Sequence, residues 1–454
     1  MFQKDEIASY KDKPIELANY VLKIIFKDKE PSFPIDPFLI LDELNIIYQF
    51  RDFKDLEGIY IVPEDDEDIH IIGINRERPI ARQRFTAAHE LCHYLKDRDE
   101  LNICPIDGRK KNPIEKFADK FASELLMPTK FLKREVEKYL VNGFISFENV
   151  LYVAEYFGVS FEACVFNIAY KLQKIEGDTR SDKLKKRINK FKPNKKKEEL
   201  GILTSDKRLM ENIINSYTMF FSETSNFIWY KFKNDFIYNE NKIEGVDIES
   251  EDVAELITDL RINAQKSEYC KSDFKDIIEV LGHADVYDYV TTTEDNISVY
   301  KILNLHAKLY KYAKYPEASG KFRNSNNYVT QSKFETVDYG SIMKEIIKLE
   351  EEVVSLINSK EILKVSEYID RAVKIHHRLT VIHPFFDGNG RVSRAFLNWL
   401  FRFKNIPPVY LKYSKKDEYY EALRLADIKN DFDKLSVIFY KEVIGSIAQL
   451  NCIV

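Results

Sequence analysis

The segment HPFFDGNGRVSR, residues 383–394, brings together side chains and backbone suited to handling phosphate groups. A proline disfavours helical backbone at the residue before it, so we expect His383 to lie just past a helix with its ring free for proton transfer. Gly388 and Gly390 permit positive φ on either side of Asn389, so successive N–H groups can converge on one anion. The positive end of the following helix adds to this attraction.

The residues after this loop predict a helix with one buried face. The apolar positions recur at i, i+3, i+4, i+7 and i+8, namely Val392, Ala395, Phe396, Trp399 and Leu400. Arg391 and Arg394 are three residues apart near the first turn, so we expect both to lie beside the loop. The alternative is a glycine-rich turn before a core helix, with a surface histidine, but the number of chemically matched positions favours a nucleotide site.

The segment resembles the signature of Fic-domain nucleotidyltransferases, His-x-Phe-x-Asp/Glu-Gly-Asn-Gly-Arg-x-x-Arg, with each specified position present. In that family the histidine deprotonates a protein hydroxyl, which attacks the α-phosphate of ATP. The resemblance implies a base (His383), a loop anchor (Phe385), a Mg²⁺ ligand (Asp387), a grip on the α- and β-phosphates (Gly388, Asn389, Gly390) and ligands of the distal phosphates (Arg391, Arg394). Such transfer depends mostly on positioning and charge neutralisation, which these residues can supply.

Two upstream segments extend the resemblance. The run LHAKLYKYAKYPEASGKFR, which ends at Arg323, resembles the helix and the Gly-Lys-Phe-Arg turn of the Fic core. Residues 327–341, rich in β-branched and aromatic side chains, occupy the position of the family's flap hairpin, where target backbone is thought to dock as an added strand. An ordinary hairpin is the alternative for this second segment.

The sequence YNENKIEGVD resembles the inhibitory helix that precedes many Fic cores, written Ser/Thr-x-x-x-Glu-Gly/Asn. Glu244 and Gly245 fit this pattern, but Glu240 stands at the Ser/Thr position, which leaves the anchoring of the helix open. The resemblance implies that Glu244 pairs with Arg394 and keeps ATP from binding productively. The alternative is a surface glutamate before a glycine that ends the helix.

A second set of chemically suited residues lies near the N-terminus, in RFTAAHELCHYL. On a helix, His89 and His93 share one face and can hold Zn²⁺, while Glu90 can serve as general base. Glu115 and Asp119 open a second predicted helix; Glu115 can complete a His₂Glu site, and Asp119 can bond the far nitrogen of a ligand histidine. The alternative for that helix is an amphipathic element whose acids only face solvent.

Together these two helices resemble the ImmA/IrrE-type zinc metallopeptidases, cytoplasmic proteases associated with cleavage of repressor proteins. The resemblance covers roughly residues 15–175 and implies short strands around 58–62 and 69–74. Cys92 stands where glycine is common in the motif; burial is favoured over a role as zinc ligand or redox group.

Residues 147–172 predict a helix, a turn at Gly158 and a second helix capped by Ser160. The pattern resembles a helix-turn-helix, but its second helix carries no cation before Lys171. Phosphate contacts need such cations, so packing or partner docking is favoured over DNA recognition.

The whole chain has 454 residues, 31% charged and 44% hydrophobic, with a net charge of −5, which is ordinary for a globular protein and does not indicate general nucleic-acid binding. Its five scattered cysteines suit reduced thiols, and neither a signal sequence nor an apolar run of membrane length is evident, so we expect a cytoplasmic protein. Residues 183–197 contain nine basic and no acidic residues, which favours a solvated linker or loosely packed helix over a nucleic-acid patch.

We therefore predict a multidomain, predominantly α protein: an α+β zincin-like metallopeptidase core (1–140), a helix-turn-helix-like tail (141–175), a basic linker (176–200), a helical region with the inhibitory helix near 238–245 (201–290), and an all-α Fic domain with a small hairpin flap (291–454).

The leading functional hypothesis is a protein adenylyltransferase using Mg-ATP, fused to a zinc endopeptidase. The partners expected are protein substrates of each domain, a repressor-like protein among them for the peptidase, with self-modification also open and no membrane. The alternatives are that the Fic half transfers another group or removes AMP, that the N-terminal half is an inactive partner-binding module, or that it is a DNA-associated regulator.

Overall fold

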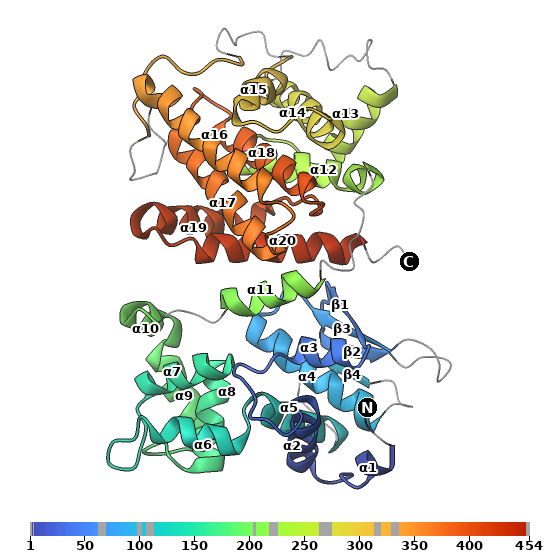
Figure 1. Cartoon of the computed structure of the whole chain (residues 1–454), viewed down its shortest axis with the longest axis vertical. Coiled ribbons are helices and arrows are strands. Elements are labelled where there is room, and N and C mark those ends of the chain that lie inside the picture. Colours follow the sequence, from blue (N-terminus) through green and yellow to red (C-terminus); the bar gives the residue numbers. More distant parts are fainter. Residues whose placement is uncertain are drawn as a thin grey trace. The chain divides into compact units, whose positions relative to one another are not determined.

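A computed structural model describes residues 2, 4–61, 70–97, 102–105, 113–202, 206–217, 226–262, 275–312, 319–327 and 336–450 (Figure 1). The chain forms two compact units, an N-terminal unit (Met1–Met210) and a C-terminal unit (Glu211–Val454). Among the described residues, no helix is both long enough and apolar enough to cross a membrane.

The N-terminal unit combines a small sheet with helices. Its elements are α1 (Lys4–Ala8), α2 (Pro14–Ile25), α3 (Pro37–Glu43), β1 (Ile47–Arg51), β2 (Leu56–Ile61), β3 (Ile71–Asn75), α4 (Ile80–Lys96), β4 (Asn102–Pro105), α5 (Pro113–Leu126), α6 (Thr129–Glu137), α7 (Phe147–Phe157), α8 (Phe161–Asn167) with a π-helical continuation (Ile168–Leu172), α9 (Ser181–Phe191) and α10 (Pro193–Leu200). Helix α11 (Asp206–Tyr217) spans the boundary between the units.

The sheet has four strands in the order β1-β3-β2-β4. Strand β3 pairs with β1 in parallel and with β2 antiparallel, and β2 pairs antiparallel with β4. The strands predicted around 58–62 and 69–74 are β2 and β3, whereas β1 and β4 were not predicted. Strand β1 buries alternate residues, Tyr48 and Phe50, so one of its faces packs into the core.

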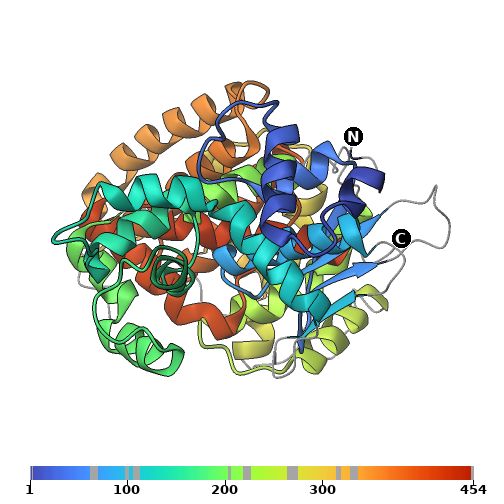
Figure 2. The same cartoon turned by 90° about the horizontal axis from the view of Figure 1, so that it is seen from below.

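Helix α4 lies against β2 and β3 and packs on α5, which also contacts α2; the sheet and these helices can be followed in Figures 1 and 2. Thirteen residues of α4 are buried, from Ile80 to Leu95, because sheet and helices cover most of its surface. The polar residues within α4 are thereby held inside the protein, where water can screen them only weakly.

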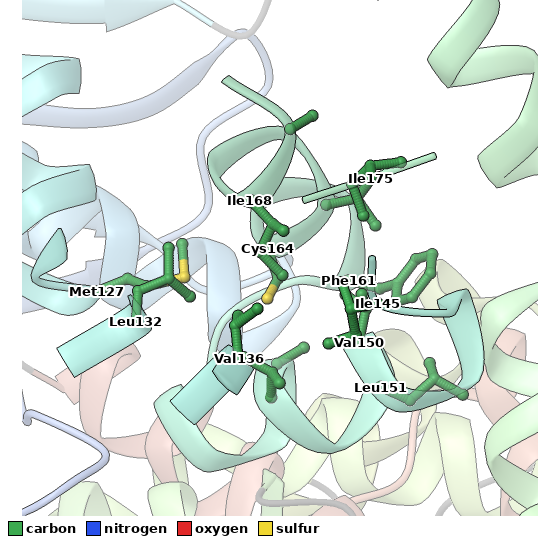
Figure 3. Close-up of a cluster of buried hydrophobic side chains, with 14 of the residues drawn as sticks. Met127, Leu132, Val136, Ile145, Val150, Leu151, Phe161, Cys164, Ile168 and Ile175 are labelled. Carbon is green, nitrogen blue, oxygen red and sulfur yellow. The ribbon is translucent and has the colours of Figure 1, made fainter. Parts of the chain in front are cut away.

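The predicted helix-turn-helix is formed by α7 and α8. Gly158 ends α7 in the left-handed conformation, and the hydroxyl of Ser160 accepts a hydrogen bond from the N–H of Ala163 at 3.2 Å. The tail packs around its own core of buried side chains, drawn in Figure 3, which include Leu132, Val150, Cys164 and Ile168. Buried Arg84 of α4 donates to the carbonyl of Gly158, so the tail is tied to the α4 helix.

The basic segment at 176–200, predicted as a linker, contains a packed helix. Residues 181–191 form α9, and its side chains Leu184 and Ile188 are buried in the core of the tail, with Phe191 packed against it. These three apolar residues recur at i, i+4 and i+7, which is enough for one packed helical face. The lysines occupy the remaining faces. Of the two interpretations drawn from the sequence, a solvated linker and a loosely packed helix, residues 181–191 agree with the helix, which is packed into the N-terminal unit.

The C-terminal unit is all-α in its described part. Its elements are α12 (Asn226–Ile243), α13 (Ser250–Ile262), α14 (Lys275–Thr292), α15 (Ile302–Leu309), α16 (Ile342–Asn358), α17 (Val365–Ile382), α18 (Asn389–Phe403), α19 (Lys416–Lys429) and α20 (Asp433–Leu450), with short 3₁₀ turns at Val299–Lys301, Tyr339–Ser341 and Tyr413–Lys415. Most of the predicted flap hairpin, residues 328–335, lies outside the described residues.

Helix α18 is the centre of this unit, in contact with α14, α15 and α17 (Figure 1). The prediction of a single buried face was too narrow, since every residue from Arg391 to Phe401 is buried. The arginines and Asn398 are therefore inside the unit together with the apolar residues. Such buried charges need partners, which the surrounding helices supply.

Candidate active sites

His383 directly follows α17, as the sequence predicts, and its backbone is left-handed with φ 50° and ψ 57°. Its Nδ1 lies 3.4 Å from the carbonyl oxygen of Thr380. A carbonyl can only accept, so this contact places the ring proton on Nδ1 and leaves Nε2 free to take a proton. Burial, followed by the charge of Arg323, lowers the pKa of His383, which keeps the ring in the neutral form that can accept a proton.

The loop after His383 is closed by Asn389. Its amide accepts a hydrogen bond from the N–H of Phe385 and donates one to the carbonyl of Phe385, both at 2.8 Å. Both polar atoms of this side chain therefore shape the loop, and the grip of Asn389 and the two glycines on the α- and β-phosphates stays a prediction. Its backbone N–H, at the start of α18, remains part of the anion-attracting helix end.

Phe385 is buried and stacks on the ring of His306, with ring centroids 4.0 Å apart. This agrees with its expected place as an anchor of the loop. The Nδ1 of His306 accepts from the N–H of Gly320 at 2.9 Å, so its Nε2 carries the proton and donates to the carbonyl of Asp387 at 3.2 Å. The carboxylate of Asp387 is exposed and accepts from the N–H of Gly388 at 2.7 Å.

The two loop glycines serve different purposes. Gly388 has φ +74°, the left-handed conformation that the sequence predicts. Gly390 was expected to do the same but lies in the first turn of α18 with ordinary helical backbone. A Cβ at Gly390 would come within 2.2 Å of the Oε1 of Glu244, so glycine is required there for close approach of that carboxylate.

Arg391 is buried and bound by groups from outside the motif. It donates to Glu279 at 2.6 Å, to the side-chain oxygen of Asn241 at 3.3 Å and to the hydroxyl of Tyr310 at 3.3 Å. Burial lowers its pKa, but Tyr310 and Glu279 outweigh that effect and raise it. Arg391 is thus held by side chains of α12 and α14 and by Tyr310, while a role in binding the distal phosphates stays a prediction.

Arg394 binds two carboxylates from the end of α12. Its Nη2 donates to Glu244 at 2.6 Å, as the resemblance implies, and its Nε donates to Glu240. Glu240 and Arg394 are 1% and 3% exposed, whereas the side chain of Glu244 is 24% exposed. Burial lowers the pKa of Arg394, but the two glutamates raise it well above its ordinary value.

The carboxylate of Glu244 occupies a position suited to an anion. It lies against the first turn of α18, where unpaired N–H groups and the helix dipole favour negative charge. It also meets the guanidinium that the resemblance assigns to the distal phosphates. Glu244 therefore stands where a phosphate group would be attracted.

The second candidate site is formed by α4 and α5 of the N-terminal unit. The Nε2 atoms of His89 and His93 are 3.1 Å apart, and Glu115 reaches them at 3.3 and 3.4 Å. These ligand atoms all lie within 4.8 Å of one another. Two imidazoles and one carboxylate form a common donor set for catalytic zinc, so the residues present fit the ion.

Each histidine of this group is oriented by an aspartate behind it. The Nδ1 of His89 lies 3.2 Å from Asp119, as predicted, and the Nδ1 of His93 lies 3.1 Å from Asp97. Burial lowers the pKa of both rings, but these aspartates and Glu115 outweigh it, raising that of His93 to about 9. Both Nε2 atoms consequently face Glu115.

Glu90 is fully buried beside this group. Burial, opposed by the charges of His89 and His93, raises the pKa of Glu90 to about 7, which suits a group that exchanges protons near neutral pH. Cys92 is also buried, and burial raises the pKa of its thiol well above the ordinary value. This supports the packing role that the sequence favours for Cys92.

Several groups in these sites were not identified from the sequence. Asp97 had a usable signal, since it lies four residues after His93 on the same helical face. Glu240 was noticed only as a departure from the family pattern. Glu279 comes from a distant helix, and nothing in the sequence connects it to Arg391.

Comparison with protein families assigns both regions. Residues 48–169 match the IrrE N-terminal-like domain, a peptidase family, and residues 296–401 match the Fic/DOC family. The chain pairs an IrrE N-terminal-like domain with a Fic/DOC domain. Both resemblances drawn from the sequence motifs are confirmed, as is the mostly helical, multidomain fold. The Fic/DOC match contains the 383–394 loop, and the IrrE-like match contains the α4 and α5 helices.

The Fic/DOC domain is similar to several eukaryotic proteins. Protein adenylyltransferase Fic-1 of Caenorhabditis elegans is 32% identical over 134 residues, which is 30% of this chain and 25% of that protein. Protein adenylyltransferase Fic of Nematostella vectensis is 28% identical over 153 residues, 33% of this chain and 34% of that protein. The chain thus spans about a quarter to a third of the length of these relatives.

Among solved structures, a fragment of Caenorhabditis elegans Fic-1 aligns with a TM-score of 0.47 at 18% identity, covering 72% of this chain and 98% of that one. A Fic domain-containing signaling protein from Bacteroides thetaiotaomicron aligns with a TM-score of 0.43 at 20% identity, covering 52% and 94% of the two chains.

Proposed function

We propose that the Fic/DOC domain transfers AMP from Mg-ATP to a protein hydroxyl. The observation that carries this proposal is the juxtaposition of a neutral base, His383, with the anion-attracting start of α18 and the guanidinium of Arg394. The two curated relatives named above, both protein adenylyltransferases, support the same reaction.

In this reaction the hydroxyl oxygen of the target attacks the α-phosphorus of ATP, and the bond to the β-phosphate oxygen breaks. Pyrophosphate leaves, and the hydroxyl proton passes to Nε2 of His383. The start of α18 and Arg394 bind the phosphates and stabilise their developing charge. The exposed Asp387 carboxylate is a hard oxygen donor that fits Mg²⁺; when bound, the ion neutralises phosphate charge.

The same domain is regulated, in this proposal, by Glu244. Its carboxylate holds Nη2 of Arg394 at 2.6 Å and lies where a distal phosphate would bind. Productive ATP binding then requires Glu244 to leave, which its partial exposure and its place at the end of α12 allow. Self-modification is the simplest reaction in which release of this inhibition can be observed.

Labelling with ATP that carries ³²P at the α-phosphate tests this function. Glu244→Gly should label itself or a target protein more strongly than the natural chain, and adding His383→Ala should abolish the label. Retained transfer without His383 would contradict the assigned base. Competition by unlabelled UTP, and a parallel reaction with γ-labelled ATP, distinguish AMP transfer from transfer of UMP or phosphate.

We infer that the IrrE-like domain is a zinc-dependent peptidase. The convergence of His89, His93 and Glu115 supports a zinc site, and the ion when bound would activate water for peptide hydrolysis. Glu90, buried beside the three ligand residues, would accept the proton of that water. The peptide substrate would be a protein partner, a repressor-like protein among the possibilities.

Metal analysis and proteolysis test this second function separately. The purified chain should contain about one zinc per molecule, and Glu115→Ala should lose most of it. Glu90→Gln should keep the zinc but lose cleavage of a protein substrate. A chain without stoichiometric zinc, or one whose biological effect survives Glu90→Gln, would favour an inactive partner-binding module.

A further inference from the structure

Arg323 binds backbone carbonyls of three segments: the start of the Fic/DOC loop, its own turn, and the segment that precedes α16. Its side chain is buried, with 3% of the residue exposed. Nε donates to the carbonyl of His383 at 2.8 Å, Nη1 donates to the carbonyl of Ser325 at 2.8 Å, and Nη2 donates to the carbonyl of Val337. A planar guanidinium is well suited to join several fixed acceptors, whereas the single ammonium of a lysine is not.

The backbone of Arg323 makes a further bond to the same loop. Its N–H donates to the carbonyl of Pro384 at 2.9 Å, so two successive carbonyls, those of His383 and Pro384, are bound by one residue. These carbonyls belong to the two residues that directly follow α17. His383 itself has φ 50°, a conformation that is uncommon for a residue with a side chain and persists only where its surroundings fix it.

We propose that Arg323 is a positioning residue: by binding the carbonyls of His383 and Val337, it fixes the left-handed turn that aims the His383 ring. It also joins that turn to the chain segment that starts at Thr336. Arg323 makes no contact with Arg391, Arg394 or Glu244 among the bonds described. Substitution of Arg323 should therefore displace the catalytic base and leave the affinity for the nucleotide nearly unchanged.

The kinetic test of this inference rests on the proposed function. The inference also predicts a change in the pKa of His383, which can be measured without any transfer activity. The groups that act on the His383 ring are Arg323, Glu244, Asp387 and the carbonyl of Thr380. Of these, Arg323 contributes a positive charge that disfavours protonation of the ring. Removing that charge should raise the pKa of His383, whereas general loosening of the fold would not single out this histidine.

The test uses the full chain carrying Glu244→Gly, with Arg323→Lys, Arg323→Gln or the control Arg378→Gln added. Arg378 lies on α17, is 40% exposed and pairs with Glu345, and none of the bonds that hold the loop carbonyls involves it. We expect both Arg323 variants to lower kcat by about tenfold to a hundredfold, the effect of misplacing a reacting group by about 1 Å, with little change in KM for ATP. The control should match its parent.

Two further readouts separate positioning from a loss of folding. In Arg323→Gln the acid limb of the pH profile should move to higher pH, and in Arg323→Lys it should stay, because lysine keeps the charge. The ¹³C-labelled His383 ring signal, assigned from a His383→Ala sample, should shift in both variants while the melting temperature stays near that of the parent.

Each outcome decides the proposal. Unchanged kcat, acid limb and His383 signal in Arg323→Gln would overturn it. If the Glu244→Gly parent shows no labelling, the proposed function fails, and the His383 signal alone still decides the role of Arg323. If Arg323→Gln does not fold, Arg323→Lys decides by kcat and by the same signal.

Discussion

Glu240 and Arg394 form a buried ion pair in which the glutamate binds Nε of the guanidinium and leaves Nη2 to Glu244. Burial, opposed by Arg394, raises the pKa of Glu240. The two glutamates differ in freedom, because Glu240 is 1% exposed and Glu244 is 24% exposed. Glu240 is therefore the fixed partner of Arg394, and Glu244 is the partner that can leave.

This difference predicts that Glu240 positions Arg394 for nucleotide and that Glu244 alone acts as the inhibitor. Glu240→Gln by itself should leave self-labelling low. Added to Glu244→Gly, it should raise KM for ATP by about tenfold, since one charged hydrogen bond that holds Arg394 is lost. Initial rates over a range of ATP concentrations give both values.

Glu249→Gln is the matched control for Glu240→Gln. Glu249 is 68% exposed and paired with Lys242, so its substitution should change neither labelling nor KM. Strong labelling by Glu240→Gln alone would show instead that both glutamates inhibit. An unfolding curve of the double variant shows whether a loss of labelling comes from unfolding or from the loss of the bond to Arg394.

The protonation of His383 predicts the pH dependence of AMP transfer. The base acts in its neutral form, and burial lowers its pKa below the ordinary 6.5. The ring therefore stays neutral as pH falls, and kcat/KM should decline only below about pH 6.5, as the pH passes the lowered pKa. The test is to measure kcat/KM of Glu244→Gly from about pH 4.5 to about pH 9, in steps of about half a pH unit. An acid limb centred above 6.5 would contradict the assignment.

The contact between Asp97 and His93 predicts a contribution to zinc affinity. Asp97→Asn keeps the side-chain shape but weakens the acceptor that orients the Nδ1 proton of His93. Zinc affinity should fall by about 10- to 100-fold, as for other groups behind metal ligands, and Asp119→Asn should behave similarly through His89. Competition with a zinc-binding dye measures this without any peptidase assay.

Glu77→Gln serves as the control for the zinc measurements. Its side chain is 44% exposed and it contacts Arg76, outside the ligand group. Affinity equal to that of the natural chain is expected. If Asp97→Asn also retains full affinity, the aspartate is a helix-end residue without influence on the metal.

The motifs were predictable from the sequence because their chemistry is local. His383, Asp387 and Arg394 lie within twelve residues, and the helix spacing of His89 and His93 fixes a shared face. The rest depended on contacts between distant segments. Arg391 is bound by Glu279, and Arg394 by Glu240, across separations that periodicity does not encode.

The expectations that differed share a second cause. Residues of the motif were expected to bind phosphate directly, whereas some of them shape the loop. Gly390 makes room for Glu244 instead of adopting positive φ, and the side chain of Asn389 closes the loop on Phe385. In the basic segment, lysine-rich composition hid three apolar residues at helical spacing, which pack α9 into the tail.

The buried ring of His306 predicts a pH-dependent contribution to the stability of the C-terminal unit. Burial lowers its pKa to about 4, while the unfolded chain should titrate near the ordinary 6.5. Between these values the unfolded state binds more protons, so the ring's stabilisation is complete above about pH 6.5 and is lost progressively as pH falls toward about 4. His306→Phe keeps the stacking on Phe385 but loses the bonds to Gly320 and Asp387.

At neutral pH the free energy of unfolding of His306→Phe should be lower than that of the natural chain by about 1–3 kcal/mol, because buried hydrogen-bond partners are left unsatisfied. The gap between natural chain and variant should narrow as pH falls from about 6.5 to about 4, because only the natural chain loses the stabilisation of this ring. Tryptophan fluorescence during denaturation reports on this unit, since both tryptophans, Trp229 and Trp399, lie in it. Lys344→Gln, at an exposed position, is the control; a gap that stays constant across this range would mean that His306 is not buried in its neutral form.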